Sequence, residues 1–192
     1  MEGTLDKLSD WVKIYEDVVS DDFCNSCVLL TEKNKDILDT VDLDWRKCQI
    51  YSNFDYSSLF DEYKDKMVEL LDNYKGEIDN VDLNHIKCIE APCLVNYRVN
   101  DYFNTHSDNW DMNSSTRQLT VILFLNDVEE GGKIVFNGFD MKINPKRGSV
   151  VIFPSYILYN NKITSPVSND AYSLISWFHF GGDSHTYRVH YI

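Results

Sequence analysis

The sequence predicts an α+β fold in which N-terminal helices back a jelly roll, that is, two facing layers of antiparallel strands. Three observations support this prediction. Apolar residues before about residue 80 recur at helical spacing, the chain after it is a series of strand-like runs, and the turns between those runs are short. No linker separates the two parts. We therefore expect one domain over residues 1–192, with mainly helical support in 1–80 and a jelly-roll core in 81–192.

The first part should contain two amphipathic helices. The segment "SSLFDEYKDKMVELLDNYKG" begins with serines that can cap a helix and ends at Gly76, a common helix stop. A second helix should begin after Ser20 as its N-cap, and a shorter one near Asp6. The apolar face of the first helix, with residues three or four apart, would be Leu59, Tyr63, Met67, Leu70 and Tyr74.

The strand-like runs are bounded by turn residues. "RQLTVILFLND" is apolar on both faces, as expected for a strand inside a sandwich or barrel. The turn signals are "EEGG" at 129–132, "NG" at 137–138, "KRG" at 146–148 and "SND" at 168–170. The predicted strands cover residues 45–54, 86–99, 117–126, 133–136, 149–153 and 172–180.

The composition excludes several function classes. A net charge of −13 and a pI near 4.6 should repel phosphate backbones and anionic lipid, so we expect neither a nucleic acid nor a membrane as partner. The N-terminal segment resembles no signal peptide, and no apolar run reaches the length of a membrane span. Five cysteines in no paired framework suit reduced thiols, and we expect a cytoplasmic protein. Cys24 and Cys27 form a lone CxxC, which fits two buried helix positions better than a zinc or redox pair.

The candidate site begins at "THSDNW". His106 and Asp108 stand two apart in a segment that is expected to be extended, so their side chains should point to the same face. An imidazole and a carboxylate aimed together are two thirds of the ligand set that holds iron(II) in non-haem oxygenases. The pair alone is a weak signal, but the segments downstream of it strengthen the interpretation.

Three segments come after the pair, in the order "RQLTVILFLNDVEEGGKIVF", "PKRGSVVIFPS" and "YSLISWF". In this order and spacing, residues 85–180 resemble the prolyl 4-hydroxylase-like branch of the 2-oxoglutarate- and iron(II)-dependent oxygenases. The resemblance implies a double-stranded β-helix, a jelly roll whose mouth holds iron(II) and 2-oxoglutarate. His106 and Asp108 match the family's proximal metal ligands. Tyr97, Thr120 and Trp177 match residues at or near the co-substrate pocket.

The resemblance fails at two chemically important positions. Where the family has its distal metal histidine, counting from "FPS" and from "YSL" both lead to Asn161, and aligning on "PV" instead gives Lys162. Where the family has an Arg or Lys for the far carboxylate of 2-oxoglutarate, this chain has Ala171. An amide oxygen is a poorer ligand for iron(II) than imidazole. A set of His106, Asp108 and Asn161 should therefore hold the metal weakly.

Other residues could compensate for these losses. If Trp177 points into the barrel, His179 on the same strand face could approach the metal from another direction. The missing positive charge could come from Lys162, our first choice for a co-substrate contact, or from Lys133 or Arg188.

These observations lead to two hypotheses about function. The first is a dioxygenase that couples decarboxylation of 2-oxoglutarate to hydroxylation of a C–H bond, with peptidyl proline as one candidate target and a peptide or small molecule as substrate. The second is a catalytically inactive relative, in which the same jelly roll acts as a binding or structural module. A more remote alternative is an oxygen-using enzyme with an altered metal set. The polar loop "DNWDMNSS", which begins at Asp108, could serve as a lid over the site.

Overall fold

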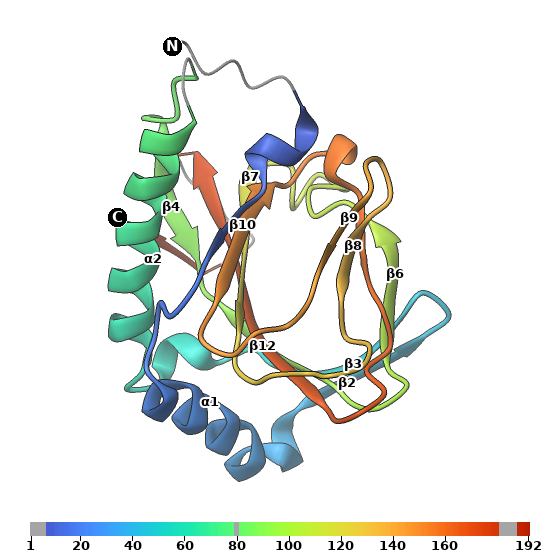
Figure 1. Ribbon diagram of the computed structural model, residues 1–192. Helices are drawn as coiled ribbons and strands as arrows, with labels where there is room; N and C mark the ends of the chain where they lie inside the picture. The colour runs from blue at the N-terminus through green and yellow to red at the C-terminus, as the bar shows by residue number, and fades with distance from the viewer. Residues whose placement is uncertain (1–6, 79–80, 181–187) are drawn as a thin grey trace.

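A computed structural model describes residues 7–78, 81–180 and 188–192 of the chain (Figure 1). Within these ranges, two α-helices lie against one face of a strongly curled, 13-stranded sheet. Every strand pair is antiparallel, as the jelly-roll prediction requires. The predicted fold class is confirmed.

The two predicted helices are present. Helix α1 spans Asp21–Lys33, and the Ser20 side chain accepts a hydrogen bond from the Phe23 backbone N–H at 3.1 Å, so the predicted N-cap is correct. Helix α2 spans Phe60–Glu77 and starts later than predicted, without a side-chain cap. A 3-10 turn at Phe54–Tyr56 uses the Ser57 backbone N–H and delays the helix start. Further 3-10 helices cover Leu8–Trp11, Lys35–Ile37 and Ile157–Tyr159.

The first of these short helices falls near the one predicted from Asp6, which itself lies outside the described residues.

The strands are β1 Lys13–Tyr15, β2 Asp39–Leu43, β3 Arg46–Tyr51, β4 Ile86–Glu90, β5 Cys93–Tyr97, β6 Tyr102–His106, β7 Arg117–Phe124, β8 Ile134–Phe136, β9 Met141–Ile143, β10 Val150–Pro154, β11 Asn161–Ile163, β12 Ala171–Phe180 and β13 Val189–Tyr191.

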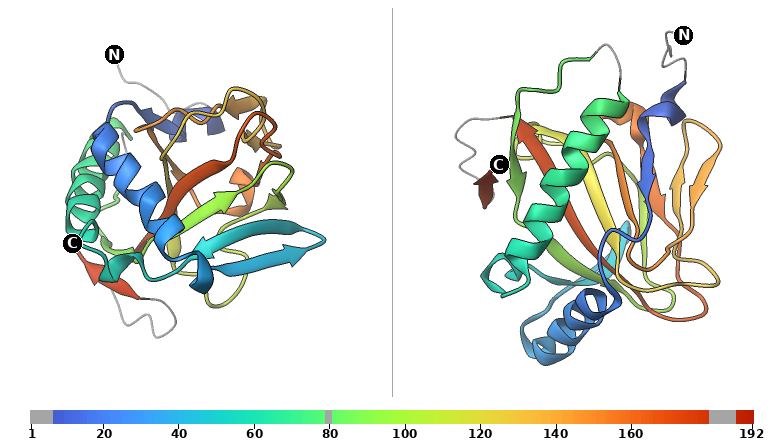
Figure 2. Two further views of the ribbon diagram at one scale, coloured as in Figure 1. Left: turned by 90° about the horizontal axis from the view of Figure 1, so that it is seen from below. Right: turned by 60° about the vertical axis from the view of Figure 1, so that its left-hand side comes forward.

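The sheet curls so that strands distant in sequence form one barrel-like wall (Figure 2). Its order runs β1-β10-β7-β12-β5-β3-β6-β11-β8-β9, with β2 on β3, and β4 on β12 and β13. Strand β3 pairs with both β5 and β6, so it joins the layer against the helices to the layer that carries β6 and β11. This connection places the end of β6 opposite β5 and β12 across the interior.

Two hydrophobic clusters explain why strand β7 is apolar on both faces. Leu119, Val121 and Leu123 pack with helices α1 and α2 in the first cluster. Ile122 and Phe124, which alternate with them, join the second cluster inside the barrel. Alternate side chains of one strand therefore serve two cores, which is why this run carries no polar alternation.

The N-terminal part also contains strands that the sequence pattern does not predict. Strand β1 pairs with β10, and β2 extends the sheet beyond β3, so residues before 80 contribute three strands as well as the helices. Strand β2 is exposed at four of its five residues, and β1 has only three, so neither gives an apolar pattern that could be recognised. The predicted strand 86–99 is divided into β4 and β5 by a break before Cys93.

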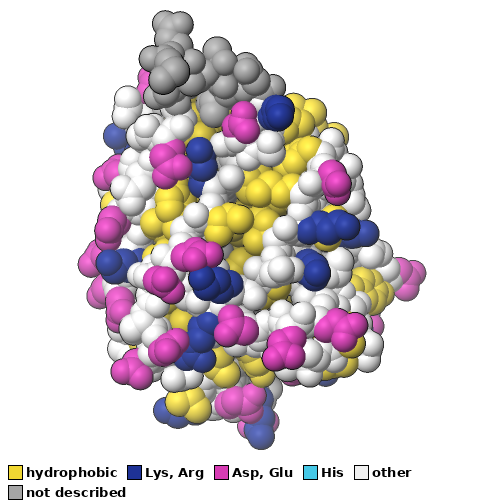
Figure 3. Space-filling model, viewed as in Figure 1, with side chains coloured by type: hydrophobic (Ala, Val, Ile, Leu, Met, Phe, Trp, Pro, Cys, Tyr) yellow, Lys and Arg dark blue, Asp and Glu magenta, His cyan; other side chains and the backbone are white. Residues whose placement is uncertain are grey.

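Charged side chains of both signs are scattered over the face of the molecule seen in Figure 3, between hydrophobic and uncharged areas. Acidic and basic groups are interspersed there, and they form no continuous basic area on that face. No helix in the described ranges is both long and apolar enough to cross a membrane.

Candidate active site

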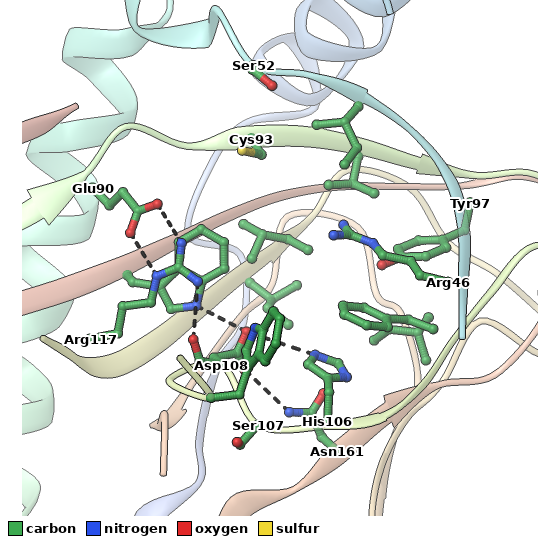
Figure 4. A pocket seen from close by; sticks show the side chains of 18 of the residues that line it. Arg46, Ser52, Glu90, Cys93, Tyr97, His106, Ser107, Asp108, Arg117 and Asn161 are labelled. Carbon is green, nitrogen blue, oxygen red and sulfur yellow. Dashed lines mark hydrogen bonds and ion pairs between the residues drawn. The ribbon is translucent and has the colours of Figure 1, made fainter. Parts of the chain in front are cut away.

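A pocket of about 480 Å³ opens into the barrel between the strands of its two layers (Figure 4). Its apolar walls come from both layers and include Val95, Ile122, Ile163 and Ile175. Its polar side chains are concentrated at three places: a floor around the end of β6, one side near β4, and another side near β3. Small-molecule sites commonly combine such apolar walls with a few convergent polar groups.

His106 and Asp108 point toward each other on the floor of this pocket. The His106 Nε2 atom lies 4.0 Å from Asp108 Oδ1, and both side chains are largely buried. His106 Nδ1 lies 2.9 Å from the Asn104 carbonyl oxygen, an acceptor, so the ring donates from Nδ1. Nε2 then carries the lone pair and faces the carboxylate, an arrangement that neighbours of metal-bound histidines commonly impose.

Asn161 completes a triangle with these two residues. It is the direct cross-strand partner of His106 in the β11–β6 pairing, and it is 2% exposed. Its Nδ2 atom lies 3.4 Å from Asp108 Oδ2, at the long end of hydrogen-bond distances. The structure thus brings together the three residues that the sequence suggested as metal ligands, with an amide at the third position.

Trp177 and Arg117 hold Asp108 in place. The Trp177 indole N–H donates to Asp108 Oδ1 at 3.1 Å, and Arg117 Nη1 donates to the Asp108 backbone oxygen at 3.1 Å. The guanidinium also stacks on the Trp177 ring, with its central carbon 3.5 Å from the ring centre. Trp177 is therefore in the pocket, where the resemblance suggested it, and its polar atom is directed at the carboxylate.

Three further sequence suggestions have different outcomes. Tyr97 lines the pocket and is 2% exposed. Thr120 does not line it: the residue is buried, and its hydroxyl lies 3.0 Å from the Ser155 hydroxyl. Lys162 does not line the pocket either, because Asn161 and Ile163 on each side of it form the wall, and alternate residues of a strand face opposite ways. The choice of Lys162 as the co-substrate contact is corrected by this geometry.

The suggested approach of His179 to the metal position is corrected as well. Its Nε2 atom lies 2.9 Å from Glu90 Oε2, and its Nδ1 atom lies 2.9 Å from the Thr116 hydroxyl, so both ring nitrogens are engaged away from that position. Glu90 in turn accepts two hydrogen bonds from Arg117, at 2.9 and 2.7 Å. His179 is therefore part of a buried ion-pair network beside the pocket.

Of the other suggested cations, Arg188 lines the edge of the pocket but forms an ion pair with Asp55 at 2.6 Å. Lys133 does not line the pocket. Arg46, on β3, is a cation that sequence reasoning missed, and it lines the pocket beside Tyr97 (Figure 4). The sequence did contain a clue to Arg46. In the predicted strand, Arg46 alternates with Cys48 and Ile50, so the arginine shares a face with two apolar residues that are expected to point into the barrel.

Burial sets the protonation states at the site. Burial lowers the pKa of His106, and the nearby Asp108 carboxylate only partly offsets this effect, so the imidazole stays neutral and able to coordinate a metal at neutral pH. Burial raises the pKa of Tyr97 well above its ordinary value, while the positive charge of Arg46 opposes the change. The phenol is therefore a hydrogen-bond donor under physiological conditions.

The model of the family described as the 2OG-Fe(II) oxygenase superfamily matches residues 93–179. Among solved structures, the viral collagen prolyl hydroxylase of Paramecium Bursaria Chlorella virus-1, in complex with 2OG, is 19% identical with a TM-score of 0.71, covering 89% of this chain and 97% of that one. A Pseudomonas putida prolyl-4-hydroxylase is 17% identical with a TM-score of 0.70, covering 90% of this chain and 94% of its own.

A third similar structure is the prolyl hydroxylase of Trichoplax adhaerens in complex with a peptide fragment of the hypoxia inducible factor oxygen degradation domain. It is 14% identical with a TM-score of 0.69, covering 90% of this chain and 84% of that one. Among curated proteins, none matches this sequence. Residues 93–179 therefore match the model of the 2OG-Fe(II) oxygenase superfamily, and the chain has the fold of the prolyl hydroxylase structures that it resembles. The resemblance seen in the sequence is confirmed.

Proposed function

We propose that this protein is an iron(II)- and 2-oxoglutarate-dependent dioxygenase that hydroxylates a C–H bond of a peptide, with a prolyl residue as the first candidate target. The observation that carries the proposal is the convergence of His106 Nε2, the Asp108 carboxylate and the Asn161 amide in the pocket of an oxygenase fold. This is the arrangement of a two-histidine, one-carboxylate site with one histidine exchanged for an amide.

The donor atoms fit a divalent metal, although one of them is weak. His106 offers Nε2 because Nδ1 is engaged with a backbone carbonyl, and Asp108 offers a carboxylate. Asn161 presents its amide nitrogen to Asp108, and a half-turn of the amide would place the oxygen there instead. Among the described residues there is no cluster of three or more His, Cys, Asp or Glu side chains that could hold a metal. The metal would therefore be held by two strong ligands and one weak one.

The chemistry that iron(II) supplies in such a site is the activation of O₂: one oxygen atom enters the substrate C–H bond, and the other enters 2-oxoglutarate, which leaves as succinate and CO₂. This chain's residues would prepare the site for that chemistry. Trp177 and Arg117 fix the Asp108 carboxylate, and the neutral His106 ring is stacked on Phe103 with ring centres 3.5 Å apart. A substrate bound against the apolar walls would displace water from the pocket, which would strengthen each polar contact inside.

Two exposed aromatic residues at the pocket support a peptide as the substrate class. Trp45 and Trp110 line the pocket while 46% and 70% exposed, respectively, so each has a ring face available to another molecule. Exposed tryptophans beside a cleft are typical contact residues for peptides and proteins. The similar Trichoplax structure holds a peptide fragment, which agrees with this substrate class.

A metal titration tests the proposal. Manganese(II), a redox-stable stand-in for iron(II), should raise the melting temperature of the wild-type protein, since a ligand that binds only the folded state stabilises it. The variant N161H should bind manganese(II) at least about tenfold more tightly, because an imidazole replaces the amide. H106A should abolish the shift. K162Q, on the opposite strand face, is the matched control and should behave like the wild type.

Absence of any shift at millimolar manganese(II) in both the wild type and N161H would contradict the proposal and favour a binding or structural module. A shift that survives H106A would place the metal elsewhere.

A further inference from the structure

Two buried polar atoms in the pocket lack a hydrogen-bond partner of ordinary geometry. They are Nε of Arg46 and the hydroxyl oxygen of Tyr97. Figure 4 shows the two side chains next to each other on the wall of the pocket away from Glu90 and Arg117. The Arg46 guanidinium does make contacts of hydrogen-bond type with the Tyr97 hydroxyl and the Cys48 side chain, but these engage only part of its five N–H donors. Buried polar groups are rarely left in this state unless a ligand or water completes them.

Arg46 also differs from the other two arginines that line the pocket. Arg117 is held by Glu90 and Arg188 by Asp55, whereas no ion pair joins Arg46 to any carboxylate of the described residues. Its guanidinium lies over the Phe103 ring, 4.5 Å from the ring centre. An aromatic face stabilises a cation but leaves the edge with its N–H donors available. The pocket therefore has a guanidinium that can receive an anion.

The position of this arginine in the sheet is informative. Strand β5, which carries Tyr97, lies between β12 and β3. On the β12 side, Tyr97 is paired with Ala171, the position at which the resemblance places the cation for 2-oxoglutarate. On the β3 side, the Gln49–Asn96 and Ile50–Val95 pairs place the start of β3 next to Tyr97. Arg46 thus reaches Tyr97 from the strand opposite to the one that carries Ala171.

We infer that Arg46, together with the Tyr97 hydroxyl, binds the far carboxylate of 2-oxoglutarate in place of the cation missing at Ala171. The inference rests on the proposed function and assigns its co-substrate a specific anchor. A planar guanidinium offers two parallel N–H donors that match a carboxylate, and the phenol adds a third donor. The keto-acid end of the same molecule would then extend toward His106 and Asp108 on the pocket floor.

Calorimetric titration of the manganese(II)-loaded protein tests the anchor without relying on turnover. Two ligands are compared: 2-oxoglutarate, and 2-oxopentanoate, which has the same chain length but no far carboxylate. The wild type should bind 2-oxoglutarate at least about tenfold more tightly, the effect expected of a hydrogen-bonded charge pair. R46M should lose this preference and keep its manganese(II) affinity. R46K should retain part of it, and K133Q, outside the pocket, should match the wild type.

The outcomes separate this inference from the proposed function. If R46M and the wild type prefer 2-oxoglutarate equally, Arg46 is not the anchor, although the metal site stands. If the wild type binds manganese(II) but does not distinguish the two ligands, the inference is also overturned. If the wild type binds no manganese(II), the proposed function fails and the inference fails with it. Should R46M be unstable, Y97F gives a second test, because it removes only a hydroxyl and should also weaken the preference.

Discussion

The pocket has an arginine on each of two sides, and they are in opposite electrostatic situations. Arg117 is buried with Glu90 and His179 in a network whose charges are internally matched. Arg46 lies over an aromatic ring with no carboxylate partner among the described residues. Both line the same cavity. The first arginine therefore shapes the site, whereas the second is available to a ligand.

The contrast follows from the cost of burying charge. An isolated buried ion is expensive, so a protein either pairs it or keeps it for an ion that binds later. Arg117 is paired, and one of its remaining donors holds the Asp108 backbone. Arg46 is half-buried, which lowers this cost while the pocket is open to water. Substitutions on either side of the pocket test whether Arg117 contributes to stability and Arg46 to ligand binding.

The largest expected effect comes from disrupting the matched network. E90Q leaves the Arg117 charge without its carboxylate, and such a loss typically destabilises a protein by about 3 to 5 kcal/mol. R46M removes a cation that has no carboxylate partner in the described residues, so without ligand it should be neutral or slightly stabilising. Urea unfolding of both variants at pH 7.5 measures the contrast. Equal losses of stability would show that the two arginines play the same structural role.

A smaller effect is expected from the group that links the network to the metal position. W177F removes the indole N–H that donates to Asp108 Oδ1 while keeping an aromatic ring. Loss of such a support typically lowers metal affinity by about 10- to 100-fold. Manganese(II) titration followed by melting temperature gives the measurement, with W45F at the exposed rim as the control. Unchanged affinity in W177F would mean that Asp108 needs no support from this side.

A pH dependence involves both sides of the pocket, and it changes stability gradually with pH. Burial raises the pKa of Cys93, which lies near Glu90, to about 11, and it raises the pKa of Cys48, although the Arg46 charge opposes the rise. In the unfolded chain these thiols ionise near about pH 8.5. Ionisation above that pH favours the unfolded state, so stability should fall between about pH 8 and pH 10, by up to about 1.4 kcal/mol per pH unit for each such thiol.

Urea midpoints measured across this range test the prediction. R46M should steepen the decline, because it removes the charge that eases ionisation of Cys48 in the folded state. A midpoint that is constant up to about pH 10 would contradict the burial of these thiols.

Patterns along the chain account for much of this molecule. The spacing of His106 and Asp108 predicted that their side chains lie together, and they do, although β6 ends at His106 and Asp108 lies in the turn that follows. The apolar periodicity of α2 and the doubly apolar β7 defined the main layers. Alignment to the oxygenase family from two anchors also identified Asn161, which pairs with His106 across β11 and β6 in the structure. The helix and strand assignments depend on periods of 3.6 and two residues, which a sequence displays directly, whereas Asn161 depended on the resemblance to the family.

Which charged side chains pair with each other, and which face the pocket, could be seen only in the three-dimensional structure. His179 and Lys162 were plausible candidates in the sequence, yet the first pairs with Glu90 and the second faces away from the pocket. Arg46 became significant once β3 was seen beside β5, next to Tyr97 and across the sheet from Ala171. The physical reason is that electrostatic pairing acts through space between strands far apart in the chain, whereas periodicity acts along it.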